Sequence, residues 1–397
     1  MSHRATVRSV RRASRLIKRL MNFAPEGWES LEEAGRKGLR QAMEAAMRRH
    51  VGERLNRSLA VGATDRHNGS FRRHLLTGLG EIELLVPRTR RFSAAELIQA
   101  YARRTQSVDR AILASFVLGL STRKVGEVLL RALGVTVSAS TVSRVSRVLD
   151  LEVASFHRRP LTNRYRVLQF DGVVLRRRTG AGAQSRPVLV ALGIRPDGKK
   201  EVLDFLLAPA ESQVAWEGFL NELYRRGLTG DGVELITIDG GAGLAAALAT
   251  VYPRIPVQRC WAHKVRNVLD GIRRADRTEA KNDLRRIYGA RSRLRACEAV
   301  VRFGARWQRE YPKAVRQITR DIEELLYFFV FVDPDWRRAT RTTNAIERRF
   351  REVKRRTRPM GVFSDRTSIE RILYAVFSYE NQNQGTGRPF PLLTQKT

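Results

Sequence analysis

Residues 166–175 read RVLQFDGVVL, and this stretch decides the fold. Apolar residues surround a single acid, Asp171, which Gly172 follows directly. A short apolar run rich in Val, Leu and Phe indicates a buried strand. We therefore predict a strand from Arg166 to Asp171 that continues or restarts at Val173. An acid at the end or edge of such a strand lies where α/β folds place their sites.

A second stretch, VELITID at residues 233–239, has the same character and also ends in an acid followed by glycine. Around these two stretches, further strands are expected at 186–194, 201–207 and 256–259, and helices at 216–226 and 244–251. Three successive strands followed by helix, strand, helix and strand form the element order of an RNase H-like fold. The sequence thus predicts an α/β core with a mixed sheet and helices.

The rest of the chain suggests how this core is divided. A mostly helical segment is expected between the first part of this core and a charged helix. The N-terminal part reads as mostly helical. The predicted regions are a basic helical segment (1–60), a DNA-binding region (61–160), the first part of the core (161–260), the mostly helical segment (261–340), the closing helix (341–380) and a flexible tail (381–397).

Three local signals refine the N-terminal half. Ser30 and Glu33 have the spacing of a capping box, which predicts a helix start. Residues 71–87 predict a β-hairpin that turns at the glycines after Thr77 and ends at Pro87. Two short helices at 119–134 and 140–149, within residues 118–150, predict a helix-turn-helix whose second helix has a hydroxyl N-cap.

The second helix of this motif has two faces. Val142, Val145 and Leu149 are predicted to face the core. The side chains predicted to face a DNA major groove are Thr141, Ser143, Arg144 and Arg147. A helical hairpin without base contacts is the alternative interpretation, and the charge of the chain favours DNA.

The charge balance points to a polyanionic partner. Lys and Arg number 74 against 40 Asp and Glu, a formal net charge of +34. Nucleic acid is the expected partner, and an anionic membrane surface is the alternative. No membrane span is expected, because the longest strongly apolar run is only 325–332. Two cysteines exclude a disulfide framework and fit a reducing, cytoplasmic compartment. The basic N-terminus is no secretory signal, although its composition also fits a mitochondrial-type transit peptide.

The strand-end acids indicate metal-assisted phosphoryl chemistry. Asp171 and Asp239 are candidate ligands for two Mg²⁺ or Mn²⁺ ions, which prefer oxygen and hold both reacting oxygens in an in-line displacement. A third acid is expected on a later helix, and Glu347 is our candidate, with Glu352 as the nearest substitute. On composition alone, a surface pair between Glu347 and Arg351 is the better interpretation.

Cys260 and His263 form a Cys-x-x-His pair that invites a zinc interpretation. A structural zinc site needs four ligands and Cys297 stands alone, so no zinc is expected. We expect the pair to support the active site. His263 either orients a carboxylate or touches a phosphate, or is an interior histidine.

Aromatic and basic residues near the proposed third acid are candidates for contacts with DNA. Trp336 is expected to be exposed and to stack on a base. A basic cluster next to the proposed third acid is expected to contact phosphates without recognising the base sequence. Its members are Arg348, Arg349, Arg351, Lys354, Arg355 and Arg356.

Several blocks, in one order, resemble the signature of Mutator-type transposases of bacterial insertion sequences. They are Phe170-Asp-Gly172, Ile238-Asp-Gly240 with Gly243-Leu244, Gln258-Arg-Cys-Trp-Ala-His-Lys-Val-Arg-Asn267, Thr342-Thr-Asn-Ala-Ile-Glu-Arg-Arg-Phe-Arg351, Val353-Lys-Arg-Arg-Thr-Arg358 and Gly361-Val-Phe363. Upstream, Gly119-Leu-Ser-Thr-Arg123 and Ser138-Ala-Ser-Thr-Val-Ser-Arg144 are similar to that family's helix-turn-helix. The resemblance covers about residues 65–380.

The resemblance implies a DDE transposase with an RNase H-like core that an all-α insertion at residues 261–340 interrupts. It further implies that Asp171, Asp239 and Glu347 bind the metal ions. It implies an enzyme that binds terminal inverted repeats and target DNA as a homodimer or larger assembly, in the bacterial cytoplasm near the nucleoid. It further implies cleavage by a metal-activated water and strand transfer by the freed 3′-hydroxyl. The alternatives are a catalytically inactive or domesticated repressor and a structure-selective nuclease of RNase H-like fold.

Overall fold

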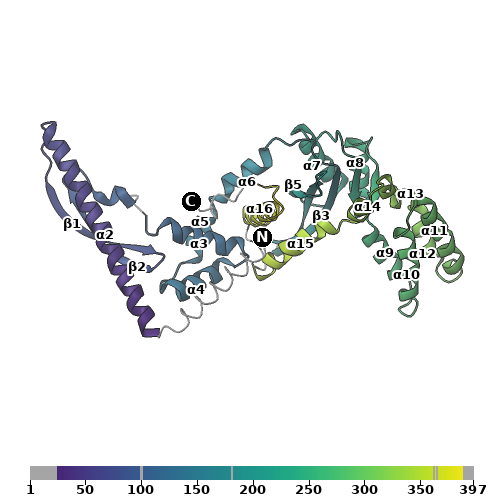
Figure 1. The fold of residues 1–397 in the computed structure, drawn as a ribbon, viewed down its shortest axis with the longest axis horizontal. Helices are drawn as coiled ribbons and strands as arrows, with labels where there is room; N and C mark the ends of the chain where they lie inside the picture. The colour runs from purple at the N-terminus through teal and green to yellow at the C-terminus, as the bar shows by residue number, and fades with distance from the viewer. Residues whose placement is uncertain (1–24, 99–101, 180–181, 361–362, 364, 388–397) are drawn as a thin grey trace, which may run out of the picture. The chain divides into compact units, whose positions relative to one another are not determined.

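The computed structural model describes residues 25–98, 102–179, 182–360, 363 and 365–387 (Figure 1). The chain forms two compact units, one comprising residues 1–114 and 122–145 and the other comprising 115–121 and 146–397. Among the described residues, no helix is long and apolar enough to cross a membrane. Each unit has its own core and is described separately below.

A long helix packed on a β-hairpin makes up most of the first unit. The helix is α2 (Pro25–Ala60), and the strands β1 (His67–Thr77) and β2 (Gly80–Thr89) pair antiparallel through a two-residue turn. Met47 and Val51 of α2 pack against Leu84 and Val86 of β2. The hairpin is therefore confirmed, with longer strands than predicted. The capping-box prediction is wrong because α2 begins before Ser30, and Pro87 lies within β2 instead of ending it.

The predicted helix pair is present with shifted ends. A short helix η1 (Ala94–Ile98) and helix α3 (Gln106–Val117) precede it, and the pair consists of α4 (Thr122–Leu133) and α5 (Ala139–Ser146). The capping hydroxyl is that of Ser138, which accepts the Thr141 amide at 3.2 Å, instead of Ser140. The second helix also stops at Ser146, and Leu149 begins the next helix, α6 (Leu149–Arg158).

The second unit is built on a five-stranded mixed sheet in the order β5-β4-β3-β6-β7. Its strands are β3 (Val167–Thr179), β4 (Gly182–Ile194), β5 (Lys200–Leu207), β6 (Leu235–Ile238) and β7 (Val257–Arg259). The first three form an antiparallel meander, whereas β6 and β7 lie parallel to β3. The expected strands and their succession are confirmed, and β3 runs through Gly172 as one strand.

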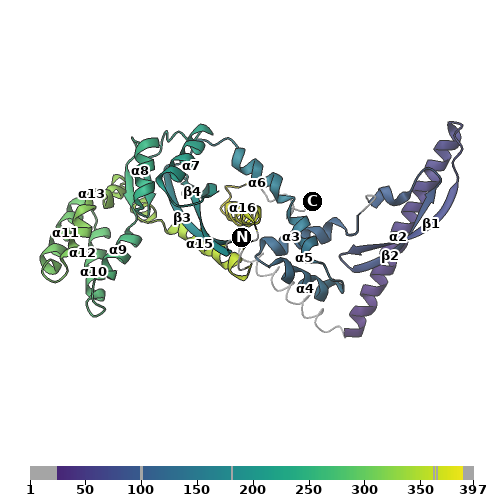
Figure 2. The same cartoon turned by 180° about the vertical axis from the view of Figure 1, so that it is seen from behind.

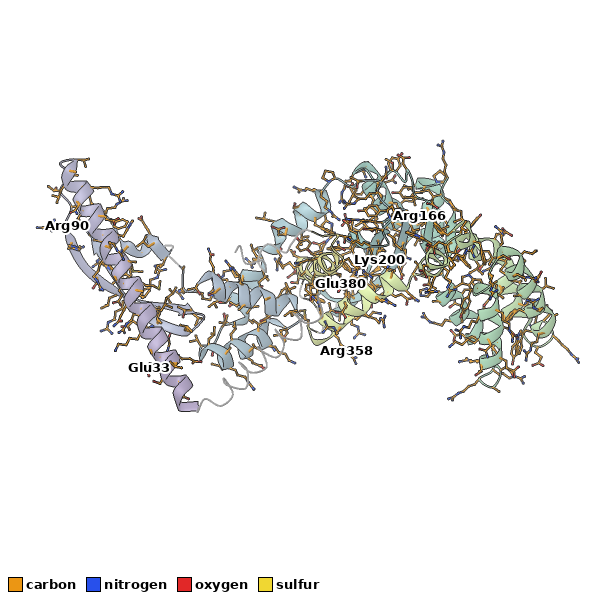
Figure 3. The ribbon with its side chains drawn as sticks, viewed as in Figure 1. Glu33, Arg90, Arg166, Lys200, Arg358 and Glu380 are labelled. Carbon is orange, nitrogen blue, oxygen red and sulfur yellow. The ribbon has the colours of Figure 1, made fainter. Side chains whose placement is uncertain are left out.

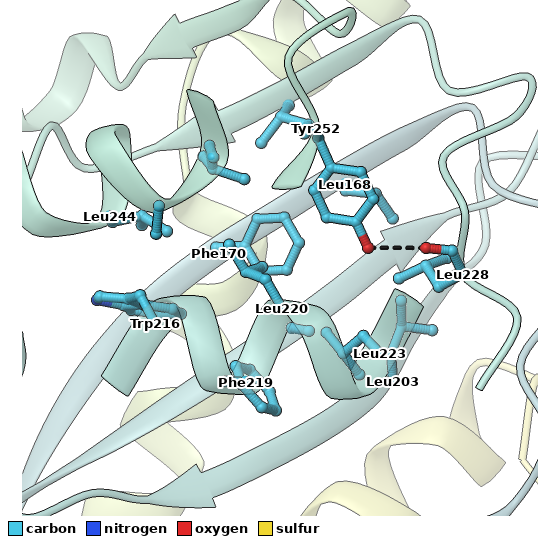
Figure 4. Packing of buried hydrophobic residues seen from close by; sticks show 14 of the residues in the cluster. Leu168, Phe170, Leu203, Trp216, Phe219, Leu220, Leu223, Leu228, Leu244 and Tyr252 are labelled. Atoms are coloured by element: carbon cyan, nitrogen blue, oxygen red, sulfur yellow. Dashed lines mark hydrogen bonds between the residues drawn. The ribbon is translucent and has the colours of Figure 1, made fainter. Parts of the chain in front are cut away.

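One face of this sheet is covered by α7 (Gln213–Arg225) and α8 (Ala242–Val251). Figure 4 shows the packing, in which Phe170 of β3 meets Trp216 of α7, with ring centroids 6.4 Å apart. The Tyr252 hydroxyl, at the end of α8, donates a hydrogen bond to the Leu228 carbonyl at 2.7 Å. Because side chains alternate along a strand, the residues between these core positions point to the opposite face.

The opposite face receives two C-terminal helices, α15 (Asn344–Thr357) and α16 (Arg366–Asn383), which contact β3 and β5 respectively (Figure 1). α16 continues past the predicted start of the tail. Asn381 is buried and exchanges two hydrogen bonds with the backbone of Val202 in β5. The tail prediction is therefore wrong at residues 381–383, and residues 388–397 lie outside the described residues.

Residues 261–340, between β7 and α15, are helical as expected. The segments are α9 (Trp261–Asp270), α10 (Arg277–Tyr288), α11 (Arg293–Trp307), α12 (Pro312–Arg320), α13 (Ile322–Leu325), η2 (Tyr327–Val330) and α14 (Pro334–Thr340). A short turn, η3 (Arg358–Met360), follows α15. The segment leaves and returns at one place, because the Trp261 amide donates a hydrogen bond to the Arg341 carbonyl at 2.9 Å. Figure 2 shows the same helices from behind.

Candidate active site

Asp171 and Asp239 occupy matching positions on neighbouring strands. Phe170 pairs with Ile238 in the parallel ladder of β3 and β6, and each aspartate is the next residue. Phe170 faces the core under α7 and α8, so Asp171, the next residue on β3, faces the side on which α15 lies, and Asp239 directly follows the end of β6 at Ile238. Asp171 accepts the Gly172 amide at 2.8 Å, and Asp239 accepts the Gly241 amide at 3.0 Å. The strands thus bring the two predicted acids together.

The electrostatics of this pair are unfavourable without a positive partner. Asp171 is buried, and the pKa of its carboxyl is raised from 3.8 to about 7, with burial as the largest cause. The neighbouring Asp239 carboxylate adds to this rise, and Glu347 contributes in the same direction. The Gly172 hydrogen bond and His263 oppose it. Two carboxylates in a poorly hydrated place resist ionising together, so the site favours a proton or a bound cation.

Glu347 lies in the first turn of α15, half-buried, on the same side of the sheet. Its Oε1 is 3.6 Å from Nε2 of His263. Its competitor Glu352 is already engaged, because Arg355 donates to it at 2.8 Å and holds the pKa of that carboxyl below its ordinary value. The ion pair that the structure gives Glu347 is with His263, instead of the expected surface pair with Arg351. The geometry therefore favours Glu347 over Glu352.

The donor set suits a hard divalent cation. Among the described residues, no group of three or more His, Cys, Asp or Glu side chains lies close enough together to hold a metal ion. Two carboxylates nevertheless suffice for Mg²⁺, which keeps several of its waters and is commonly held by one or two carboxylates. A cation beside Asp171 and Asp239 would also remove the conflict that raises the pKa of Asp171. Asp171 and Asp239 therefore fit a bound Mg²⁺ ion.

Cys260 and His263 support the start of α15. Cys260 is fully buried, and its Sγ accepts hydrogen bonds from both the amide and the hydroxyl of Thr343 at 3.3 Å. Interaction with Cys260 raises the pKa of His263 from 6.5 to about 9, with help from Asp171 and Glu347 and against burial. Nδ1 of His263 is buried and has no hydrogen-bond partner. The carboxylate-orienting role fits His263 better than an interior role.

The basic residues of α15 divide into two groups. Arg348, Arg351, Lys354 and Arg355 are exposed, as expected of phosphate contacts. Arg349 is only 6% exposed and donates to the Ala345 carbonyl, and Arg356 is 2% exposed and donates to the Val117 carbonyl. The expectation that these two contact phosphate is wrong, because their guanidinium groups satisfy backbone carbonyls inside the fold.

The other predicted DNA contacts are placed as follows. Trp336 is half-buried, with its ring stacked on Phe331 and the Arg166 guanidinium 4.6 Å from its centroid, so its expected exposure is only partial. In the helix pair, Val142 is fully buried and Leu149 is buried, while Val145 is half-buried. Arg144 and Arg147 are exposed, and Thr141 and Ser143 are partly exposed.

Sequence reasoning missed Glu211, which precedes α7. A Cβ at position 172 would lie 3.0 Å from both of its carboxylate oxygens, so Gly172 leaves room for the Glu211 carboxylate against β3. Loss of solvent and the nearby Asp239 raise the pKa of Glu211 above its ordinary value. The only signal in the sequence was Gly172 itself, which indicates that some group approaches the backbone closely.

Comparison with known proteins identifies the family. The model of the Mutator family of transposases matches residues 14–385. The chain is 31% identical to the transposase for insertion sequence element IS905 of Lactococcus lactis, covering 92% of this chain and 93% of the relative. It is 30% identical to the transposase for IS256 in transposon Tn4001 of Staphylococcus aureus, covering 78% and 79%.

A solved structure, the Drosophila P element transposase strand transfer complex, aligns over 71% of this chain and 79% of that chain with 11% identity and a TM-score of 0.30. The family match, unlike this distant alignment, spans nearly the whole sequence. The chain therefore belongs to the Mutator family of transposases, the group that includes transposases of bacterial insertion sequences.

Proposed function

We propose that the chain is a DDE transposase with an RNase H-like core, which binds terminal inverted repeats, cleaves DNA strands and joins the freed 3′-hydroxyl to target DNA. One observation carries the proposal. Asp171 and Asp239 follow the paired residues Phe170 and Ile238 on adjacent parallel strands, and Glu347 faces the same side from α15 beside His263. The strand order, with the meander beside the parallel pair, supports the RNase H-like assignment.

Each side chain has a distinct task in this proposal. Asp171 and Asp239 bind the metal ions from the sheet, and Glu347 completes the site from the opposing helix. His263, whose pKa is raised to about 9, is protonated at neutral pH and holds the Glu347 carboxylate in place. The exposed Arg348 and Arg351 hold strand phosphates near the acids. Two Mg²⁺ or Mn²⁺ ions supply activation of the attacking oxygen and neutralisation of the phosphate charge.

The DNA partners follow from the same reasoning. Arg144 and Arg147 are exposed in and just after α5, where a recognition helix would meet bases of the element's ends. An element has two ends, so the working assembly is a homodimer or larger on two inverted repeats. Such an enzyme acts in the bacterial cytoplasm near the nucleoid.

The acids are tested by amide substitutions in the full-length protein. Asp171→Asn, Asp239→Asn and Glu347→Gln should each abolish Mg²⁺-dependent cleavage and joining of DNA carrying the element's ends, while end binding persists. Glu352→Gln is the matched control, because its carboxylate is engaged by Arg355, and it should retain cleavage. Full activity in Glu347→Gln together with loss in Glu352→Gln would reverse the assignment of the third acid.

The same experiment separates the enzyme from a DNA-binding repressor. A wild-type protein that binds the ends tightly but cleaves nothing with either Mg²⁺ or Mn²⁺ would replace the transposase proposal with the repressor. Cleavage of branched DNA without end binding would replace it with a structure-selective nuclease.

A further inference from the structure

The four residues that lead into α15 are all held by the core of the second unit. The Thr340 carbonyl accepts the Thr237 hydroxyl at 2.7 Å, and the Arg341 carbonyl accepts the Trp261 amide at 2.9 Å. The Thr342 carbonyl accepts Nε2 of Gln169 at 3.0 Å, and Thr343 donates twice to Cys260. No residue of this segment, which we call the return segment (residues 340–343), lacks such a hydrogen bond.

Two of these partners have a special place in the sheet. Gln169 lies two residues before Asp171 on β3, and Thr237 lies two residues before Asp239 on β6. They are a registered pair in the parallel ladder, and both are fully buried. Because side chains two apart on a strand share a face, the two strands present one polar row to the return segment and one acidic row to Glu347.

Gln169 is not the side chain that folding stability alone would favour at this position. Its Nε2 donates to Thr342, whereas its Oε1 is buried and has no hydrogen-bond partner. A buried acceptor without a partner costs free energy that an apolar side chain of the same size would not. Thr237, by contrast, is used fully as a donor to Thr340. The feature that Gln169 supplies is therefore a donor aimed at the return segment.

We propose that Gln169 and Thr237 are positioning residues, which fix the start of α15 on the strands that carry the two aspartates and so register Glu347 to Asp171 and Asp239. This inference rests on the proposed function, in which Glu347 is the third acid. The connection to Glu347 is short, because the Thr343 carbonyl accepts the amides of both Ile346 and Glu347 at 3.0 Å. A shift of the return segment moves the first turn of α15, which carries Glu347.

The test uses the full-length chain and two readouts. Thr237→Val and Gln169→Met remove the donors while keeping side-chain size. Tyr252→Phe is the matched control, because it removes another buried hydroxyl that donates to a backbone carbonyl, on the other face of the same sheet (Figure 4). The readouts are single-turnover cleavage with Mg²⁺, measured beside end binding, and hydrogen–deuterium exchange in the metal-free protein.

A positioning role predicts a local effect. Thr237→Val and Gln169→Met should each lower the cleavage rate by on the order of 10²-fold, as misplacement by about 1 Å does, with end binding unchanged. Exchange should quicken in the peptide that carries Ile346 and Glu347 and stay unchanged in α7 and α8. Thr237→Ser should restore both readouts, and Tyr252→Phe should change neither.

Opposite outcomes overturn the proposal. Wild-type cleavage in both variants, or faster exchange spread evenly over α7, α8 and α15, would reduce Gln169 and Thr237 to ordinary core residues. If Thr237→Val does not fold, Gln169→Met and Thr237→Ser still decide the question. A Glu347→Gln protein that cleaves normally would instead overturn the proposed function itself, which separates the two failures.

Discussion

Single side chains decide which arginines of α15 can meet DNA. Arg348 is exposed, whereas its neighbour Arg349 is buried, donates to Ala345 and has its pKa lowered by burial. The periodicity of the helix turns adjacent residues by about 100°, so neighbours in the sequence face different surroundings. Figure 3 shows the side chains of the whole described chain, among which charged residues such as Arg166 and Arg358 are labelled. A run of basic residues in the sequence therefore does not form one continuous basic surface.

This division leads to a paired prediction. Arg348→Ala should weaken binding to all DNA sequences equally and reduce the slope of log affinity against log salt by about 1, because one phosphate contact is lost. Arg349→Met should leave that slope unchanged, since the buried guanidinium reaches no phosphate. Binding titrations at several salt concentrations measure both. Equal slopes for the two variants would contradict the division.

At the scale of elements, buried charge pairs hold the helical segment between β7 and α15 together. Lys264 of α9 donates to Asp321, which follows α12, and both side chains are buried. Burial alone would raise the pKa of Asp321, but hydrogen bonds from Arg320 and Lys264 outweigh it and lower the pKa from 3.8 to about 2. The pair joins two helices that are far apart in the sequence, so it ties the end of the segment to its beginning.

The lowered pKa gives a stability that depends on pH. Asp321 is more acidic in the folded chain, so its contribution is fully present above its unfolded pKa and is lost as pH falls toward about 2. At pH 7, Asp321→Asn should lower the free energy of unfolding by about 2 kcal/mol. That deficit should stay constant from pH 7 to 5 and shrink below about pH 4. Urea unfolding of both proteins across this range measures it, and a deficit independent of pH would contradict the assignment.

A second element-scale prediction concerns the glycine after α3. Gly119 has φ +102°, and a Cβ there would lie 2.9 Å from Cα and Cβ of Arg356 in α15. Gly119→Ala should therefore lower the free energy of unfolding by roughly 1–3 kcal/mol. Gly218→Ala, within α7 and with no atom within 4 Å of its Cβ, should instead raise it by about 0.5–1 kcal/mol. Thermal unfolding compares the two, and a stable Gly119→Ala protein would show that α15 yields at this contact.

Elements with a strong hydrophobic pattern could be predicted from the sequence, whereas contacts between elements that are distant in the sequence could not. Apolar runs such as that around Phe170 predicted all five strands and their succession along the chain, because burial on both faces leaves a continuous signal. The boundaries at Ser30, Pro87 and Ser140 failed, since local cap and turn signals compete with tertiary packing. Glu211 and the return segment were missed because a loop acid or a strand glutamine gains its role only from what packs against it.

At the scale of the whole molecule, charge dominates. The formal net charge of +34 is spread over a chain that belongs to the Mutator family of transposases. A surface so basic attracts the phosphate backbone regardless of sequence. In the proposed function, α5 then selects among the DNA sites that this non-specific attraction brings close.

Affinity for DNA should accordingly fall steeply with salt. With roughly 6–10 phosphate contacts, binding should weaken about 10³–10⁵-fold between 50 and 200 mM salt. Fluorescence anisotropy with an element end and with random duplex of equal length measures this response. A nearly flat response on both would remove the electrostatic account.

The hydrogen bond between Trp261 and Arg341 closes the base of the helical segment that lies between β7 and α15. Because this segment starts and ends at one hydrogen-bonded position, its length and sequence can change while the geometry of the candidate active site stays the same.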